Sequence, residues 1–292
     1  MCISETETDT EGKESEGNPI MFEIELKDRE FQKLSNLIFK KAGIYLHEGK
    51  KGLVKARMGK ILREGGFKSF NEYLRHVQSD KSGQELIRLI DRISTNHTFF
   101  FREADHFDFL KERVVPEFLK NRVGIEPLRV WSSACSSGEE PYSIAITLLE
   151  MKDRSFDFQI IATDISTEML KTAQRGIYKI DRVKGLSGDI LKRYFKRGIN
   201  RWKGYIKIKE DVKRYVQFQR VNLMEDFNFK EPFHVIFCRN VMIYFKRENR
   251  EYLVNRLYRY LKKGGYLITG HSESLHGIKH PFRYIRSSIY QR

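Results

Sequence analysis

The segment 94–103, "STNHTFFFRE", places three phenylalanines directly before a charged pair, Arg102 and Glu103. A guanidinium binds carboxylates through parallel charge-assisted hydrogen bonds. Apolar neighbours exclude the water that would weaken such bonds. This order of residues predicts that Arg102 holds an anionic group beside an apolar wall formed by residues 99–101. From the residues alone, an ion pair from Arg102 to Glu103 or Asp105 is the alternative.

Acidic residues follow the first two predicted strands. The first, 128–133, leads into "SACSSGEEPYS", where small residues leave room for a ligand, but Glu139 and Glu140 would repel a pyrophosphate. We therefore expect a cationic cofactor, and S-adenosylmethionine is the common one on sheets of this kind. The second strand ends in Asp164. Its separation from the loop along the chain is close to the ~20 residues after which an acid bonds the ribose hydroxyls of a nucleotide. Asp164 can equally cap the helix that follows.

Two further polar pairs lie where a ligand would be expected. In "VNLME", Asn222 can bond an adenine edge and Leu223 can pack on its face; a turn asparagine and a core leucine are the alternative. The predicted strand 233–241 ends in adjacent Arg239 and Asn240. Because an unpaired buried polar group costs about 1–3 kcal/mol, this pair predicts a pocket.

The elements that must position these residues alternate between strands and helices after residue 94. Strand-like runs lie at 128–133, 158–165, 233–241, 264–271 and 282–291, and helical stretches at 141–151, 166–176 and 248–261. This order predicts an α/β fold, a doubly wound Rossmann-like sheet with helices on both faces, whose ligand sits at the carboxyl ends of the strands. Residues 198–218 alternate polar and apolar side chains between glycines, which predicts a small antiparallel β-hairpin insertion.

The N-terminal third has a different composition. Residues 1–19 are acidic and poor in apolar side chains, so we expect a disordered tail. Residues 20–94 show apolar groups at three- and four-residue steps, which predicts a small all-helical domain, followed by a catalytic domain over 95–292. The stretch 40–68 carries nine basic and two acidic residues. It is either a solvated face or a docking surface for acidic groups; its candidate docking residues are Lys55, Arg57, Lys60 and Arg63.

The overall charge limits the choice of partner. The 292 residues include 54 Lys and Arg against 39 Asp and Glu, a net charge of +15, which favours nucleic acid, an anionic membrane surface or an acidic protein. Three cysteines without a CxxC pair predict neither a disulfide framework nor a metal site. They favour a location in the reducing cytoplasm. No apolar run approaches the ~18 residues of a membrane span, so we expect no membrane insertion.

Taken together, the motifs resemble a known family. "STNHTFFFRE", "RVWSSACSSGEEPYSIAI", "ATDIS", "VNLM", "FCRNVMIYF" and "GGYLITGHSES" occur in this order. They are similar to motifs of the chemotaxis receptor glutamate methyltransferases, the CheR family, over about residues 22–290. The resemblance implies methyl transfer from S-adenosylmethionine to glutamate side chains of methyl-accepting chemotaxis receptors. The products would be glutamyl methyl esters and S-adenosylhomocysteine.

The resemblance also implies roles for individual residues. The family's cofactor contacts fall on Asn96, Thr98, Arg102, Glu140, Asp164, Asn222, Leu223, Arg239 and Asn240. Arg102 and Tyr244 are the implied catalytic residues. The basic helical domain would face acidic receptor helices, and the insertion can bind a receptor C-terminal tether. His97 and Cys135 stand where leucine and alanine are frequent, and neither change removes a polar group.

The reaction requires no side chain of the protein to remove a proton from the substrate. A glutamate with a reference pKa of about 4.3 is already ionised, so the site must align the carboxylate rather than deprotonate it. We expect a monomer that binds no nucleic acid. Two alternatives remain: an RNA-modifying methyltransferase, which the basic charge suits although an NPPY-like strand end is absent, and a cofactor-binding module without turnover.

Overall fold

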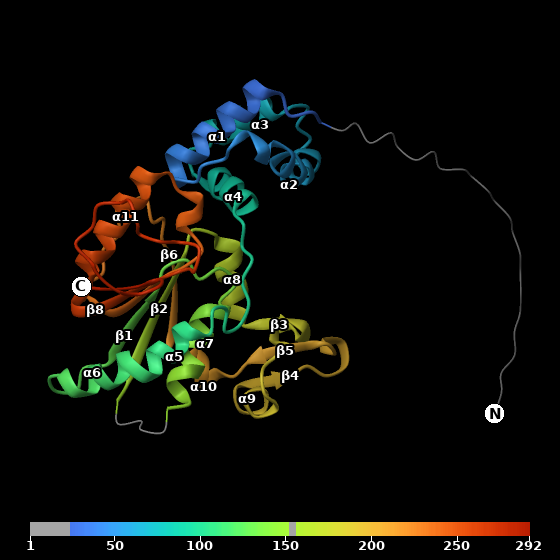
Figure 1. Ribbon diagram of the computed structural model, residues 1–292. Helices are drawn as coiled ribbons and strands as arrows, with labels where there is room; N and C mark the ends of the chain where they lie inside the picture. The colour runs from blue at the N-terminus through green and yellow to red at the C-terminus, as the bar shows by residue number, and fades with distance from the viewer. Residues whose placement is uncertain (1–23, 152–155) are drawn as a thin grey trace, which may run out of the picture.

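The computed structural model describes residues 24–151 and 156–292, which fold into a helical part and an α/β part (Figure 1). The acidic tail predicted over 1–19 lies outside the described residues. Of the helices that are described, none combines the length and the apolar character needed to cross a bilayer.

The helical part contains α1 (Asp28–Ala42), α2 (Lys51–Glu64), α3 (Phe70–Ser79) and α4 (Gln84–Ile93), with a short 3-10 turn, η1 (Glu48–Lys50), before α2. It has its own apolar core, to which the four helices contribute Leu34, Ile38, Met58, Leu62, Phe70 and Leu89. Local sequence sets the helix ends: the Ser69 hydroxyl accepts the Glu72 amide at the start of α3. Gly43 ends α1 with a left-handed φ of 71°.

A seven-stranded sheet in the order β6-β2-β1-β7-β8-β10-β9 forms the centre of the α/β part. Its strands are β1 (Leu128–Ser132), β2 (Phe158–Asp164), β6 (Val216–Arg220), β7 (Phe233–Cys238), β8 (Leu261–Thr269), β9 (Arg283–Arg286) and β10 (Ile289–Gln291). The five strands from β6 to β8 are parallel, and β10 runs antiparallel to both its neighbours. From β1 the chain proceeds outward to β2 and β6, then returns to β7 on the other side. The strand order therefore reverses between β1 and β7, where a doubly wound sheet binds its ligand.

Helices cover both faces of this sheet (Figure 1). Outside the insertion, the helical segments of the α/β part are α5 (Asp105–Phe109), η2 (Leu110–Val114), α6 (Val115–Asn121), α7 (Glu139–Leu149), α8 (Thr167–Arg175), η5 (Met242–Tyr244) and α11 (Arg247–Tyr260). Alternate residues of β1 point to opposite cores: Val130 packs in the cluster that contains α7, and Trp131 in the cluster that contains α11. The predicted doubly wound fold is confirmed, and the strand-like run 282–291 forms two strands, β9 and β10.

The insertion is a separate three-stranded antiparallel sheet, β3-β5-β4. It comprises β3 (Ile177–Lys179), η3 (Ile180–Val183), α9 (Gly188–Tyr194), β4 (Phe195–Arg197), η4 (Asn200–Trp202) and β5 (Tyr205–Ile208), and α10 (Glu210–Lys213) follows it. An antiparallel insertion is confirmed, but the bounds 198–218 are wrong, because residues 216–220 form β6 of the central sheet. As an edge strand with partly exposed side chains, β6 has the alternation typical of a hairpin.

His234 on β7 makes the stability of the fold depend on pH. Its Nδ1 accepts the Arg129 backbone N–H at 2.9 Å, so the folded state needs the neutral ring. Burial, with the nearby Lys262, lowers the pKa of His234 to about 4. In the unfolded chain this pKa is about 6.5, so below that pH the unfolded state binds a proton that the folded state refuses. Stability is therefore lost as the pH falls from about 6.5 toward 4.

We expect the melting temperature to fall less on acidification in the variant His234→Asn than in the wild type. The asparagine Oδ1 can accept the same N–H but does not titrate. Thermal melts across this pH window measure the difference between the two proteins. The pKa of His106 is also lowered to about 4. Its effect on the melting temperature is the same in the wild type and in His234→Asn, so it cancels in the comparison. Parallel curves for the two proteins would contradict the assignment.

Candidate active site

One cleft lies at the carboxyl ends of β1, β2 and β7 and contains about 1230 Å³ of empty space, including its open mouth. All ten residues predicted to bind the cofactor or to act in catalysis line it: Asn96, Thr98, Arg102, Glu140, Asp164, Asn222, Leu223, Arg239, Asn240 and Tyr244. They come from five separate stretches of sequence. The fold thus brings together the residues that the motifs singled out.

The helical part supplies a second wall of the cleft, which the motifs did not predict. Tyr45, Lys50 and Leu53 line it, and Tyr45 and Leu53 are exposed. The Tyr45 backbone N–H donates to the Tyr244 carbonyl at 2.8 Å, and Ile44 forms a β-bridge with Phe245. An available signal was the apolar "IYL" in a short non-helical linker after Gly43.

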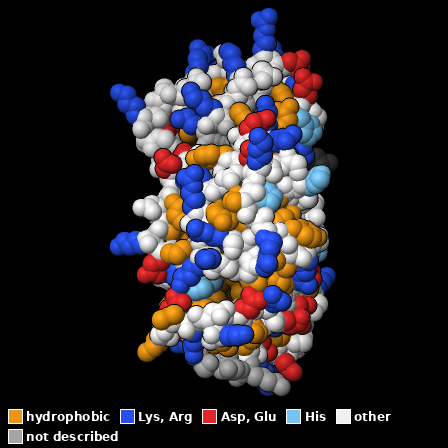
Figure 2. Space-filling model, turned by 60° about the vertical axis from the view of Figure 1, so that its left-hand side comes forward, with side chains coloured by type: hydrophobic (Ala, Val, Ile, Leu, Met, Phe, Trp, Pro, Cys, Tyr) orange, Lys and Arg blue, Asp and Glu red, His pale blue; other side chains and the backbone are white. Residues whose placement is uncertain are grey.

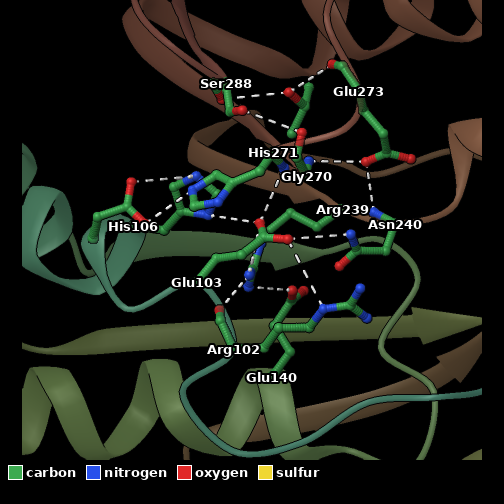
Figure 3. A network of polar contacts seen from close by, with 12 residues as sticks. Arg102, Glu103, His106, Glu140, Arg239, Asn240, Gly270, His271, Glu273 and Ser288 are labelled. Atoms are coloured by element: carbon green, nitrogen blue, oxygen red, sulfur yellow. Dashed lines mark hydrogen bonds and ion pairs between the residues drawn. The ribbon is translucent and has the colours of Figure 1, made fainter.

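A buried guanidinium organises the floor of the cleft (Figure 3). The side chain of Arg239 is 1% exposed and lies between two carboxylates. Its Nη1 donates to Glu140 Oε2 at 2.9 Å, and its Nη2 to Glu103 Oε2 at 3.1 Å and to the Arg102 carbonyl. Glu140 Oε1 accepts the Ser132 hydroxyl at 2.7 Å. Arg239 is therefore largely engaged by the protein, and it can serve a ligand mainly by holding Glu140 in place.

Two carboxylates, the buried Asp164 and the largely buried Glu140, give the cleft a region suited to a cation. Burial raises the pKa of Glu140, although Arg239 opposes the shift. Burial also raises the pKa of Asp164, against backbone hydrogen bonds from Ser166 and Ser136. A ligand cation would favour the ionised form of both groups. The donor set therefore fits S-adenosylmethionine, which carries a sulfonium and an ammonium group.

Asp164 ends β2 and bridges two loops. Its Oδ2 accepts the Ser136 amide at 2.7 Å and its Oδ1 the Ser166 amide at 2.9 Å. The cap of α8 is Ser166 itself, whose hydroxyl accepts the Met169 amide. Asp164 thus contacts the backbone just before α8 without being its cap, and it also borders the cleft.

Asn222 and Leu223 make the contacts expected of a turn asparagine and a core leucine. Asn222 Oδ1 accepts the Met224 amide at 3.0 Å, and its Nδ2 donates to the Lys41 carbonyl at 2.6 Å. Leu223 is buried in the cluster that contains α11. Both also line the cleft, so a ligand-binding role stays a prediction.

The apolar wall differs from the prediction. Of the three phenylalanines before Arg102, only Phe99 lines the cleft, together with Phe107 from α5. Phe100 is buried against Tyr178 and Phe195, and Phe101 packs on Phe107. The prediction that residues 99–101 form the apolar wall is therefore wrong in part. The backbone turns after Phe100, and the side chains of Phe100 and Phe101 point into the core.

Arg102 faces the cleft with a partly exposed side chain. Its Nη1 donates to the His97 carbonyl at 3.0 Å, and its Nε lies 3.9 Å from Glu103 Oε1. The second distance is too long for a hydrogen bond, so the local ion pair is weak. Tyr244 lies in η5, after β7, and also borders the cleft. Both positions suit the predicted catalytic roles.

The four candidate docking residues lie on α2 and do not line the cleft. Lys60 and Arg63 are exposed, and Lys60 is 3.6 Å from Glu64. Arg57 donates to the carbonyls of Ile93 and Ser94 at 2.5 and 3.2 Å, so it anchors the connection between the two parts of the protein.

The carboxylate of Glu140 predicts a pH-dependent affinity for the cationic cofactor. Because the pKa of Glu140 is raised, its charge is lost at a higher pH than for an ordinary glutamate. We expect the affinity for S-adenosylmethionine to fall on lowering the pH from roughly 8 to roughly 5, and to fall less for Glu140→Gln. Calorimetric titrations measure both. S-adenosylhomocysteine, which lacks the sulfonium charge, is the control and should show a weaker dependence; an equal dependence for both ligands would contradict the assignment.

Comparison with known proteins identifies the family. The family description "CheR methyltransferase, SAM binding domain" matches residues 96–291, and "CheR methyltransferase, all-alpha domain" matches residues 29–94. The chemotaxis protein methyltransferase of Borreliella burgdorferi is 40% identical over 281 residues, covering 94% of this chain and 98% of that protein. Those of Salmonella typhimurium and Escherichia coli are 38% and 36% identical over 269 residues, each covering 91% of this chain and 91% and 92% of their own.

Fold and cleft thus define an S-adenosylmethionine-dependent methyltransferase with a doubly wound sheet. Its cofactor is S-adenosylmethionine. The chain belongs to the CheR methyltransferase family, whose relatives act in chemotaxis.

Proposed function

We propose that this enzyme transfers the methyl group of S-adenosylmethionine to glutamate side chains of chemotaxis receptors. The supporting observation is a single cleft in which buried carboxylates suited to a cationic cofactor lie alongside Arg102 and Tyr244. The cleft opens beside a basic helical domain. Such an arrangement suits a substrate that is itself a carboxylate on an acidic surface.

The chemistry requires alignment and exclusion of water. When bound, the cofactor supplies a methyl group activated by its positive sulfur. A carboxylate oxygen forms the new C–O bond as the C–S bond breaks, which leaves a neutral ester and S-adenosylhomocysteine, and no proton is transferred. Arg102 would hold a carboxylate through charge-assisted bonds, and Tyr244 would donate its hydroxyl beside the reacting atoms. Phe99 and Phe107 keep this side of the cleft apolar.

The receptor would dock on the helical domain. Lys and Arg side chains gather at the end of the molecule formed by the N-terminal helices (Figure 2). Lys60 and Arg63 on α2 are exposed there, and Lys55 lies on the same helix. Acidic receptor helices would be attracted to this surface and steered to the cleft. Because Arg57 is engaged with the backbone of 93–94, we expect its replacement to affect stability as well as docking.

The insertion offers a place for a receptor tether. In the β3-β5-β4 sheet, β4 lies at an edge. Ile199 and Trp202, in the turn that follows β4, are both exposed. An extended peptide could add a strand to this edge and place apolar side chains against these residues.

We further propose that the enzyme acts as a monomer in the cytoplasm, where the free buried thiols of Cys135 and Cys238 are stable.

The decisive experiment incubates the enzyme with a purified receptor cytoplasmic fragment and tritiated S-adenosylmethionine. We expect label on the receptor that mild base releases as methanol, since carboxyl esters hydrolyse where methylamines and methyl ethers do not. A fragment with its acceptor glutamates changed to alanine is the control. Base-stable label, label on RNA instead, or cofactor binding without any transfer would each overturn the proposal.

A further inference from the structure

The backbone around Arg102 is held in an unusual conformation. Phe101 and Glu103, the residues on either side, both have left-handed φ values, 56° and 59°. Residues other than glycine rarely adopt this region, and they persist there only where the surroundings enforce it. Two such residues around one arginine imply that the turn is held by specific contacts, which can be named.

Glu103 makes most of those contacts (Figure 3). Its Oε2 accepts Arg239 Nη2 at 3.1 Å and the His271 backbone N–H at 3.2 Å, while its Oε1 lies 3.3 Å from Asn240 Nδ2. Arg239 and Asn240 follow β7, and His271 follows β8. One carboxylate therefore ties the turn that carries Arg102 to the carboxyl ends of two central strands.

Other contacts leave the turn little freedom. The Phe101 N–H donates to the Ser143 hydroxyl at 2.9 Å, and Arg239 also donates to the Arg102 carbonyl. Beside Glu103 lies His106, which is fully buried; its Nδ1 is 3.5 Å from Glu103 Oε2. No hydrogen-bond partner for either nitrogen of the His106 ring is found among the described residues. The ring therefore contacts the carboxylate by packing rather than by a hydrogen bond.

Glu103 does not line the cleft, whereas its neighbours Arg102, Arg239 and Asn240 do. Burial opposes the ionisation of Glu103, but Arg239 and Asn240 outweigh it and lower its pKa, so the carboxylate is charged. Glu103, His106 and His271 also place ligand-type atoms within 4.8 Å of one another. A metal ion there would have to displace Arg239 and would lie beside its positive charge, so the contacts favour an organising role.

We propose that Glu103 is a positioning residue, which holds Arg102 in its strained turn and aims the guanidinium into the cleft. The inference rests on the proposed function only for the role of Arg102. Glu103→Gln retains the side-chain volume but removes the charge that binds Arg239. A misplacement of about 1 Å can cost ~100-fold in rate, so we expect kcat for methyl transfer to fall about 10- to 100-fold, with KM for S-adenosylmethionine changed much less.

A double-mutant cycle separates this role from a merely structural one. If Glu103 acts through Arg102, then Glu103→Gln costs nothing more in an Arg102→Ala background, whereas independent roles give losses that multiply. Asp105→Asn is the matched control. It removes an acid two residues away that is half exposed and contacts His271, and we expect near wild-type transfer. A wild-type rate for Glu103→Gln, or multiplicative losses in the double variant, would overturn the proposal.

A second measurement does not depend on the receptor. Hydrogen exchange on the protein alone should show faster exchange of the backbone amides of 101–103 in Glu103→Gln than in Asp105→Asn. Should Glu103→Gln not fold, Glu103→Asp retains the charge opposite Arg239 and shortens its reach, and we expect the same increase. Unchanged exchange would refute the inference even if the receptor is methylated. Faster exchange without receptor esters would instead refute the proposed function and leave the positioning of the turn intact.

Discussion

Arg239→Met will lower the free energy of unfolding by about 3–5 kcal/mol, because it leaves the largely buried carboxylates of Glu103 and Glu140 without their shared partner. At roughly 2–4 °C per kcal/mol, this corresponds to a melting temperature lower by ~6–20 °C. The cofactor affinity should fall with it, since Glu140 loses the contact that fixes it. Denaturant unfolding and calorimetry measure the two effects.

The control for that change is Arg259→Met, which removes an exposed arginine from α11 and should alter the free energy of unfolding by less than about 0.5 kcal/mol. The pH dependence offers a second test. In Arg239→Met both carboxylates can accept protons, so the loss of stability should shrink as the pH is lowered. A destabilisation that is small, or independent of pH, would show that Arg239 does not compensate these charges.

Arg102→Ala should lower kcat/KM for methyl transfer about 100- to 1,000-fold, the cost of removing one preorganised group that stabilises the reacting charges. The fold should survive, because the side chain is partly exposed and its one short contact is with the His97 carbonyl. Initial rates of labelled ester formation measure the loss. The melting temperature establishes that the protein is intact, and binding of S-adenosylhomocysteine shows how far Arg102 also contributes to holding the cofactor.

Two companion variants make the test of Arg102 specific. Arg102→Lys retains the charge but not the two-pronged geometry, so we expect partial activity. Tyr244→Phe removes only a hydroxyl that borders the cleft and should cost less than Arg102→Ala. Near wild-type transfer by Arg102→Ala would remove Arg102 from the catalytic machinery and leave the cofactor cleft as described.

The sequence was most informative where strands end. Arg239 and Asn240 predicted a pocket because buried strands seldom end in polar pairs, and both line the cleft. The alternation of strand-like runs and helical stretches after residue 94 likewise predicted the doubly wound sheet. Glu103 was noticed only as a neighbour of Arg102. Its partners Asn240 and His271 lie more than a hundred residues away, and no local pattern reveals such contacts.

The other differences have the same physical origin. Residues 216–220 resembled a hairpin because an edge strand is exposed on part of its surface, and only its pairing with β2 shows that it belongs to the central sheet. The wall of the cleft formed by Tyr45 and Lys50 was not predicted: the apolar "IYL" marked the linker, but its position at the cleft depends on how one domain packs against the other. The direction of Phe100 and Phe101 depends on a left-handed φ that composition does not specify.

The link between the two parts of the chain limits how this enzyme can be rebuilt. Backbone groups of Lys41 and Tyr45 bond Asn222 and Tyr244, and Ile44 pairs with Phe245, all at the border of the cleft. The helical domain is therefore not an exchangeable cassette. Because these bonds use only backbone groups of the helical part, a chimera that borrows residues 28–93 from a relative would keep them only if the segment 41–45 retains its length and conformation, and an insertion there should disturb the cleft.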